Sequence, residues 1–153
     1  AAGFGFDLAL SCDIRIGCPK STFVIGYTGA GVAPDSGGTW FMPRIMGIAK
    51  TLEFIYTGEP CLADEAHRIG LLNRIIPLEQ LQEESLKMAR KITNGAPIAF
   101  RLSKFQVYKG LQMDLETALG VAMACVTIAT DSADHREALK SFAHKRAPKF
   151  QDK

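Results

Sequence analysis

The segment that most constrains the fold of this chain is residues 23–40, where a short apolar run leads into a glycine-rich loop. Glycine adopts backbone conformations that other residues avoid, and it lets a ligand approach the main chain closely. A lone acid, Asp35, follows the loop, and residues 36–38 (Ser-Gly-Gly) then prepare the start of a helix. This order predicts a carboxylate placed beside a binding site. The alternative is that Asp35 caps the helix, because Asp is a favoured N-cap residue.

A second glycine cluster lies at the start of the chain, where Gly3 and Gly5 precede a short helix predicted over residues 5–11. The first amide groups of a helix have no partner within the helix, and that end carries positive dipole charge. Such a helix start can hold an anion or an oxygen that gains charge during a reaction. The alternative is a tight turn packed in the core.

The composition argues against several classes of protein. A net charge of +2, without aromatic residues among basic runs, does not fit a nucleic-acid binder. Basic residues become dense only over residues 140–153, which is typical of a solvated face, with a phosphate contact as the alternative. No apolar run reaches transmembrane length. The cysteines lack metal-binding spacing and fit reduced, mostly buried thiols of a cytoplasmic protein. They are Cys12, Cys18, Cys61 and Cys125.

The pattern of the chain changes near residue 78, from a glycine-rich α/β part (residues 1–77) to a helical part (residues 78–153). In the first part we expect strands over 13–16, 22–25 and 74–76, and helices over 36–57, broken near Gly47, and over 63–69. In the second part apolar residues recur at helical spacing. This spacing predicts helices from 78 to the break at 94–97, over 98–109, around 115–129 and over 133–144.

A series of motifs, in order along the whole chain, resembles the enoyl-CoA hydratase/isomerase (crotonase) family. They lie at residues 2–10, 12–16, 34–44, 57–58, 63–66, 70–73 and 141–150. The resemblance implies an α/β fold, with the C-terminal part of the crotonase (ClpP-like) β-β-α spiral in residues 1–77 and a helical trimerisation region in residues 78–153. It also implies that an N-terminal half of the fold is absent from the sequence, so we expect these 153 residues alone to be inactive.

The same resemblance implies chemistry on an acyl-CoA thioester. Removing or adding a proton beside the thioester makes an enolate, whose oxygen two backbone amides can hold while a carboxylate moves the proton. On this assignment the backbone N–H of Phe4 is one oxyanion-hole donor, and Asp35 is the proton shuttle. Coenzyme A is part of the substrate, and we expect no other cofactor and no metal.

The acidic residues favour one reaction of the family over another. Hydratases of the family use two glutamates, whose positions here hold Asp7 and Tyr27, and Tyr27 is not an acid. Some isomerases of the family place an aspartate at the position of Asp35, and the string at residues 34–40 is closest to the phenylacetate-pathway ring-oxepin type. We therefore expect double-bond isomerisation. The alternatives are hydration of a 2-enoyl-CoA and a catalytically silent structural subunit.

Further roles follow from position within the family. Asp7 serves either as a second acid or as a favourable charge in the first turn of its helix. Gly3, Tyr27 and Gly31 are expected to line the substrate pocket. Phe142 and Lys145 match positions that contact the adenine and phosphate part of coenzyme A, often across a subunit boundary. The expected assembly is a homotrimer or a dimer of trimers. The small-residue face at Ala118, Ala122, Ala124 and Ala129 packs either within its subunit or against a neighbour.

Overall fold

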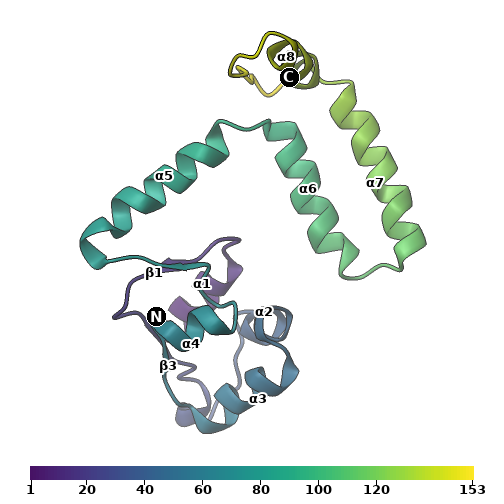
Figure 1. Ribbon diagram of the computed structural model, residues 1–153. Coiled ribbons are helices and arrows are strands. Elements are labelled where there is room, and N and C mark those ends of the chain that lie inside the picture. The colour runs from purple at the N-terminus through teal and green to yellow at the C-terminus, as the bar shows by residue number, and fades with distance from the viewer. The chain divides into compact units, whose positions relative to one another are not determined.

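The computed structural model describes residues 1–153 and divides the chain into two compact units, Ala1–Leu86 and Lys87–Lys153 (Figure 1). The elements of the first unit are α1 (Phe4–Ser11), β1 (Ile16–Gly17), β2 (Thr22–Phe23), the 3-10 helix η1 (Thr28–Ala30), α2 (Gly38–Met46), α3 (Ile48–Thr57), β3 (Cys61–Leu62), α4 (Ala63–Arg68), β4 (Arg74–Ile75) and the 3-10 helix η2 (Leu78–Gln80). Helix α5 (Leu81–Thr93) contains the division between the units.

The strands of the first unit are short and form two pairs. β1 pairs with β4 in parallel, and β2 pairs with β3 in antiparallel register. β1 begins only at the end of the predicted strand 13–16, because the Arg15 N–H donates to the side chain of Asn73 and not to a backbone carbonyl. β3 was not predicted, since two residues between a proline and a helix carry no alternating pattern.

The core of the first unit forms where α1, α2 and the strands meet. Phe6 and Leu10 are four residues apart in α1 and therefore share one face of the helix. Both are almost fully buried, and the ring of Phe6 lies 5.6 Å from that of Phe23, measured between centroids. The other buried apolar side chains of this core are Ile25, Met42, Phe54, Cys61, Ala63, Ala66, Leu71 and Leu72. Burial of apolar surface is the main force that stabilises such a core.

The predicted break between helices at Gly47 is confirmed. Gly47 has φ 81° and ψ 162°, a conformation that side chains strongly disfavour, and it separates α2 from α3. The hydroxyl of Thr51, which is buried, donates to the carbonyl of Gly47 and fastens the start of α3. The turn therefore keeps the two helices packed against each other.

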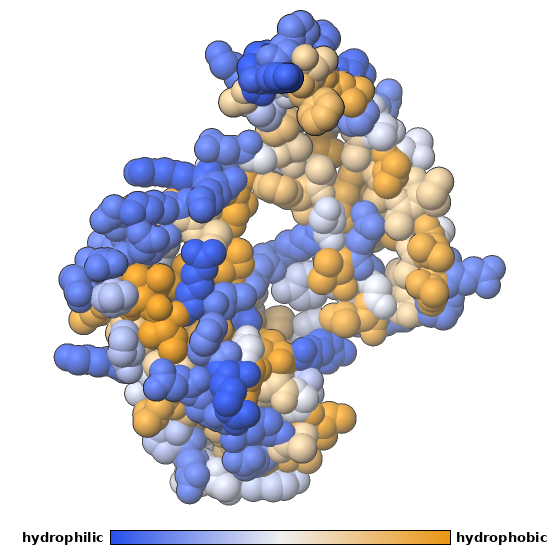
Figure 2. Space-filling view, in the orientation of Figure 1, coloured by the Kyte–Doolittle hydropathy of each residue, from blue (hydrophilic) through white to orange (hydrophobic).

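The second unit contains three helices, α6 (Pro97–Gly110), α7 (Leu115–Thr130) and α8 (Ala133–Ala143), close to the predicted spans. Side chains cap two of them: Asp114 accepts from the Thr117 N–H, and Ser132 accepts from the His135 N–H. Large apolar side chains stay exposed along α7 (Figure 2). They are Leu115, Leu119, Met123, Val126 and Ile128. No single helix has the length and hydropathy of a membrane span. Only α7 and α8 taken together have that length and hydropathy, and the pair is bent by 72°.

Two carboxylates of α8 hold the C-terminal tail of the chain. Asp134 is buried and accepts from the backbone N–H groups of Gln151 and Asp152, at 2.7 and 3.0 Å. Glu137 forms a bidentate ion pair with Arg146, at 2.6 and 2.9 Å, and accepts from the Lys149 N–H at 2.9 Å. The basic end of the chain, for which we expected a solvated face, is thus attached to α8 at several points.

Replacing Glu137 tests this attachment. The Arg146 guanidinium, and after it the Lys149 N–H, lower the pKa of Glu137 from 4.5 to about 2. A lowered pKa means that the carboxylate contributes stability above pH 4.5, and that this contribution is lost as the pH falls towards 2. We expect Glu137→Gln to lower the thermal unfolding midpoint at pH 7, and we expect the difference from wild type to shrink as the pH falls through this window. The exposed Glu116→Gln is the control, and a difference that stays constant with pH would contradict the assignment.

A second test concerns the contact between α1 and α2. Gly38 is the buried first residue of α2, and a Cβ there would overlap Oδ1 of Asp7 and lie 3.0 Å from its Cγ. We expect Gly38→Ala to lower the free energy of unfolding by about 1–3 kcal/mol, as overpacking of a core does. Gly5→Ala is the control, because a Cβ there meets nothing within 4 Å.

The cause of that loss can be isolated with a second substitution. Asp7→Ala removes the overlapping carboxylate, so the loss in the double variant should be smaller than the sum of the two single losses. Equal effects of Gly38→Ala and Gly5→Ala in denaturant unfolding would show that the contact is unimportant.

Candidate active site

The most buried charged group of the first unit is the carboxylate of Asp7, which is only 2% exposed. It lies in the first turn of α1, next to the core residue Phe6. The phenol of Tyr27 donates a hydrogen bond of 2.8 Å to its Oδ2, and its Oδ1 lies against Gly38. Asp7 therefore contacts both ends of the glycine-rich loop between Tyr27 and Gly38. The place of Asp7 in the first turn agrees with a favourable interaction with the helix dipole. Its carboxylate also packs directly against Gly38.

The loop itself folds back on Tyr27. The carbonyl of Tyr27 accepts hydrogen bonds from the Ala30 and Val32 N–H groups, at 3.0 and 3.1 Å. Gly31 ends η1 with φ 73°, in the left-handed region that favours glycine. The hydroxyl of Thr28 donates to the carbonyl of Ile55 in α3. The loop is thus closed by its own hydrogen bonds and is joined to α3.

Asp35 lies at the far end of this loop and is exposed to solvent. Its Oδ1 accepts a hydrogen bond of 2.8 Å from the hydroxyl of Ser36. The N-cap of α2 is Gly37, in the left-handed conformation, and no side chain caps this helix. Asp35 is therefore not a helix cap, and its carboxylate remains open to a reacting molecule.

The charges of Asp7 and Asp35 both act on the pKa of Tyr27. Partial burial of the phenol raises the pKa of Tyr27 above its usual value, while the nearby Ser36 hydroxyl acts in the opposite direction. The hydrogen bond to Asp7 and the charges of Asp7 and Asp35 raise that pKa further. Tyr27 therefore stays protonated at neutral pH and acts as a steady hydrogen-bond donor.

The helix start at Phe4 has the features of an anion site. Gly3 has φ 49°, and its N–H donates to the Val24 carbonyl. The Phe6 and Asp7 N–H groups both donate to the Gly3 carbonyl, at 2.9 and 3.1 Å. The Phe4 N–H takes no part in these hydrogen bonds, and the Phe4 side chain is 67% exposed. This amide is thus free to donate to an oxygen that approaches the positive end of the helix.

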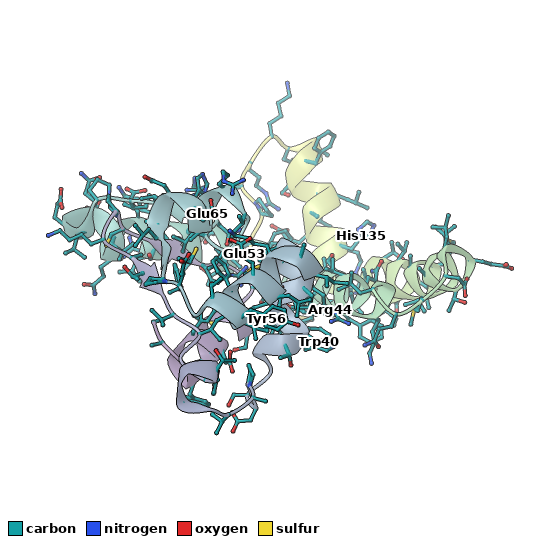
Figure 3. The ribbon with its side chains drawn as sticks, turned by 90° about the horizontal axis from the view of Figure 1, so that it is seen from below. Trp40, Arg44, Glu53, Tyr56, Glu65 and His135 are labelled. Carbon is teal, nitrogen blue, oxygen red and sulfur yellow. The ribbon has the colours of Figure 1, made fainter.

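The basic and acidic side chains of the neighbouring helices are engaged elsewhere. The Arg44 guanidinium lies over the ring of Trp40, 3.9 Å from its centroid, on α2 (Figure 3). Glu53 of α3 and Glu65 of α4, which Figure 3 labels, both form ion pairs with Lys50, at 2.8 and 3.1 Å. These contacts stabilise the surface of the first unit and leave Asp35 without a cationic partner among them.

Two other predicted site residues belong to the second unit. Phe142 lies near the end of α8 and is 86% exposed. Lys145 follows α8 with φ 52°, an uncommon value for a residue with a side chain. Of the histidines, His67 and His144 are exposed, whereas His135 is half-buried. None of the three is part of the group formed by Asp7, Tyr27 and Asp35.

Ser36 and Gly38 could not be singled out as site residues from the sequence alone. Ser36 was considered only as part of a helix start, although its hydroxyl is the partner of the Asp35 carboxylate. Gly38 must be glycine because the Asp7 carboxylate occupies the space of its side chain. A serine directly after a candidate base is a signal that sequence inspection could have used.

Each of these groups has the chemistry that one part of a proton transfer beside a stabilised anion requires. Asp35 is an open carboxylate, which suits a general base or acid. The Phe4 N–H is a donor at a positive helix end, which suits an oxygen that gains negative charge. Asp7, in contrast, is enclosed and held by Tyr27.

Known proteins resemble this chain over its whole length. The sequence model of the enoyl-CoA hydratase/isomerase family matches residues 1–153. A short-chain-enoyl-CoA hydratase of Clostridium acetobutylicum is 35% identical over 146 residues, covering 95% of this chain and 56% of the relative. An enoyl-CoA isomerase/hydratase of Mycosarcoma maydis is 35% identical over 155 residues, covering 100% of this chain and 56% of the relative. The chain thus spans little more than half the length of these relatives.

A solved structure confirms the predicted fold. The crystal structure of an enoyl-CoA hydratase from Bacillus anthracis superimposes with a TM-score of 0.96 at 34% sequence identity, over 100% of this chain and 59% of that one. The α/β crotonase fold expected from the motifs is therefore present. From its sequence and its structure alike, the chain belongs to the enoyl-CoA hydratase/isomerase family.

Proposed function

We propose that the protein shifts the double bond of an enoyl-CoA thioester, with Asp35 as the proton shuttle and the Phe4 N–H as a donor to the enolate oxygen. One observation carries this proposal. Of the two candidate carboxylates, Asp35 is exposed, whereas Asp7 is 2% exposed and bonded to Tyr27. The string at residues 34–40 supports an isomerase of the phenylacetate-pathway type.

The proposed reaction needs one carboxylate and an anion site. Asp35 removes a proton from the carbon next to the thioester carbonyl, and the negative charge moves onto the thioester oxygen. The protonated Asp35 then returns the proton to the far carbon of the original double bond while the new double bond forms next to the thioester carbonyl, so that no atom is gained or lost. An amide that holds the charged oxygen contributes about 3–4 kcal/mol to lowering the barrier of such reactions.

Hydration of a 2-enoyl-CoA is the second candidate, because a relative at 35% identity is named a short-chain-enoyl-CoA hydratase. Adding water is best served by two groups, one that activates water and one that protonates carbon. Here the second carboxylate, Asp7, is enclosed and held by a phenol. Comparing 3-enoyl-CoA isomerisation with 2-enoyl-CoA hydration on the full-length protein decides between the two reactions.

We extend the proposal to the second unit. Phe142 is 86% exposed and Lys145 is exposed close behind it, as contacts to the adenine and phosphate part of coenzyme A require. A lysine suits a phosphate because its ammonium group is a compact charge. The exposed apolar side chains of α7 support an assembly of several copies through the helical region.

The first prediction from this proposal concerns Asp35. We expect Asp35→Asn in the full-length protein to lower isomerisation at least ~100-fold, because general acid–base groups contribute about 10²–10⁴-fold. Asp35 caps no helix and is exposed, so the melting temperature should stay at the wild-type value. Activity close to wild type in a normally folded variant would remove Asp35 from the chemistry.

The second prediction compares the two carboxylates. We expect Asp7→Asn to reduce turnover less than Asp35→Asn does, because Asp7 is enclosed and does not face a reacting molecule directly. The rates of both variants are measured on 3-enoyl-CoA and 2-enoyl-CoA substrates. If Asp7→Asn is the more damaging change and the protein hydrates 2-enoyl-CoA efficiently, the isomerase assignment is wrong.

A further inference from the structure

The segment that carries Asp35 is anchored at its two ends. Before it, the loop is closed by hydrogen bonds to the Tyr27 carbonyl, and after it, the Gly37 carbonyl accepts the first backbone hydrogen bonds of α2. Residues 33–36, between these points, make no backbone hydrogen bond. Pro34 stiffens this short stretch, because its ring fixes its own φ angle. The place of the Asp35 carboxylate therefore depends on where the two ends of the loop are held.

One buried carboxylate contacts both of these ends. Oδ2 of Asp7 accepts a hydrogen bond of 2.8 Å from the Tyr27 phenol, and Oδ1 lies against Gly38, the first residue of α2. Asp7 is 2% exposed, and Phe6 and Leu10 of the same helix belong to the core. The two oxygens of Asp7 are thus fixed points, between which the loop leaves the core and returns to it.

We propose that Asp7 is a positioning residue, which acts as a hydrogen-bond acceptor and a packing surface, not as an acid, and so fixes the loop that places Asp35 for proton transfer. This inference rests on the proposed function in one respect, the use of Asp35 as the proton shuttle. Tyr27 and Gly38 connect Asp7 to the loop, so its effect on the rate passes through the placement of Asp35.

The surroundings of Asp7 argue against a direct part in proton transfer. A general acid or base must come within hydrogen-bond reach of the proton that it moves, about 2.6–3.2 Å between heavy atoms. One oxygen of Asp7 already accepts from a phenol, and the other faces the backbone at the start of α2. A substrate would have to displace one of these contacts to reach the carboxylate.

Holding the loop from the interior matters for the rate of the proposed reaction. Misplacing a catalytic group by about 1 Å can cost ~10²-fold in rate. A loop that becomes ordered only when the substrate binds also loses conformational entropy at that moment. Because Asp7 holds both ends of the loop in the free protein, Asp35 is in place before the substrate arrives.

Two replacements of Asp7 in the full-length protein separate positioning from proton transfer. Asn has the shape of Asp and keeps an oxygen that accepts from the Tyr27 phenol, but its amide does not exchange a proton as a carboxylate does. Ala removes both contacts. We expect Asp7→Asn to lower kcat a few-fold at most, and Asp7→Ala to lower it about 10–100-fold, with KM changed by less than about twofold. The control is Asp64→Ala, which removes an exposed carboxylate of α4 and should leave kcat unchanged.

Each Asp7 variant is also combined with Asp35→Asn. In that background Asp7→Ala should lower kcat no further, since the group that Asp7 positions is absent. Equal losses in Asp7→Asn and Asp7→Ala, as expected of an acid, would overturn the inference. A loss in Asp7→Ala that is as large with Asp35→Asn as with Asp35 intact, as expected of general damage to the fold, would also overturn it, as would an unchanged kcat in Asp7→Ala.

Melting temperatures are recorded for all variants, and the rates are measured below the lowest of them. If Asp7→Ala does not fold, Tyr27→Phe takes its place, because it removes the hydrogen bond to Asp7 and keeps the ring. Its loss of kcat should then be larger than that of Asp7→Asn, and it should disappear with Asp35→Asn. The opposite result in either comparison contradicts the inference.

These measurements separate the inference from the proposed function. The rates are followed for 3-enoyl-CoA isomerisation and 2-enoyl-CoA hydration, and the comparison uses whichever reaction the wild-type protein catalyses. A protein that only hydrates would reject the isomerase assignment, while the difference between Asp7→Asn and Asp7→Ala would still test the role of Asp7. If Asp35→Asn alone leaves both reactions unchanged, the proposed function is wrong, and so is the use of Asp7 to position Asp35.

Discussion

Burial of the Asp7 carboxylate is the constraint on which much of the first unit depends. An ionised carboxylate is costly to remove from water unless it is paired or hydrogen-bonded. Here the Tyr27 phenol supplies the hydrogen bond. The same carboxylate occupies the side-chain space of Gly38, so that α2 can begin close against α1 only because residue 38 is glycine. One buried charge thus determines the distance between two helices and the course of the loop between them.

This constraint gives two aspartates different environments within one small site. Asp7 is enclosed by its own contacts, whereas Asp35 is exposed and bonded to a single hydroxyl. Two carboxylates of the same type can serve different purposes when their surroundings differ. In the proposed chemistry the exposed one moves the proton, and the enclosed one holds the loop that carries it. The Tyr27 phenol helps to hold the loop, because it donates a hydrogen bond to Asp7. It does not supply a second carboxylate.

The sequence was informative where local chemistry decides the structure. The helix breaks at Gly47 and Gly58 follow from positive φ angles that glycine favours, and the exposed acid after the loop follows from its glycine-rich surroundings. Contacts between distant residues were not predictable in this way. The bond between Asp7 and Tyr27 joins residues 20 positions apart, and the two-residue strand β3 exists only because β2 lies beside it. The contacts of Asp134 and Glu137 with the C-terminal tail could not be predicted for the same reason, since a basic tail has the composition of a solvated face.

In the second unit, too, acidic side chains hold a segment of backbone in place: Asp134 and Glu137 bind the C-terminal tail. Lys145 has φ 52°, a conformation that costs a residue with a side chain on the order of 1 kcal/mol or more. This conformation persists because the surrounding backbone is held. The Lys145 N–H donates to the carbonyl of Phe142, and the Arg146 N–H donates to the carbonyl of Ser141. The Arg146 side chain forms an ion pair with Glu137. A paired carboxylate therefore fixes the backbone around Lys145, as a buried carboxylate fixes the loop before Asp35. In each unit the residue proposed to meet the substrate is exposed, and its position is determined by an acidic side chain that does not itself meet the substrate.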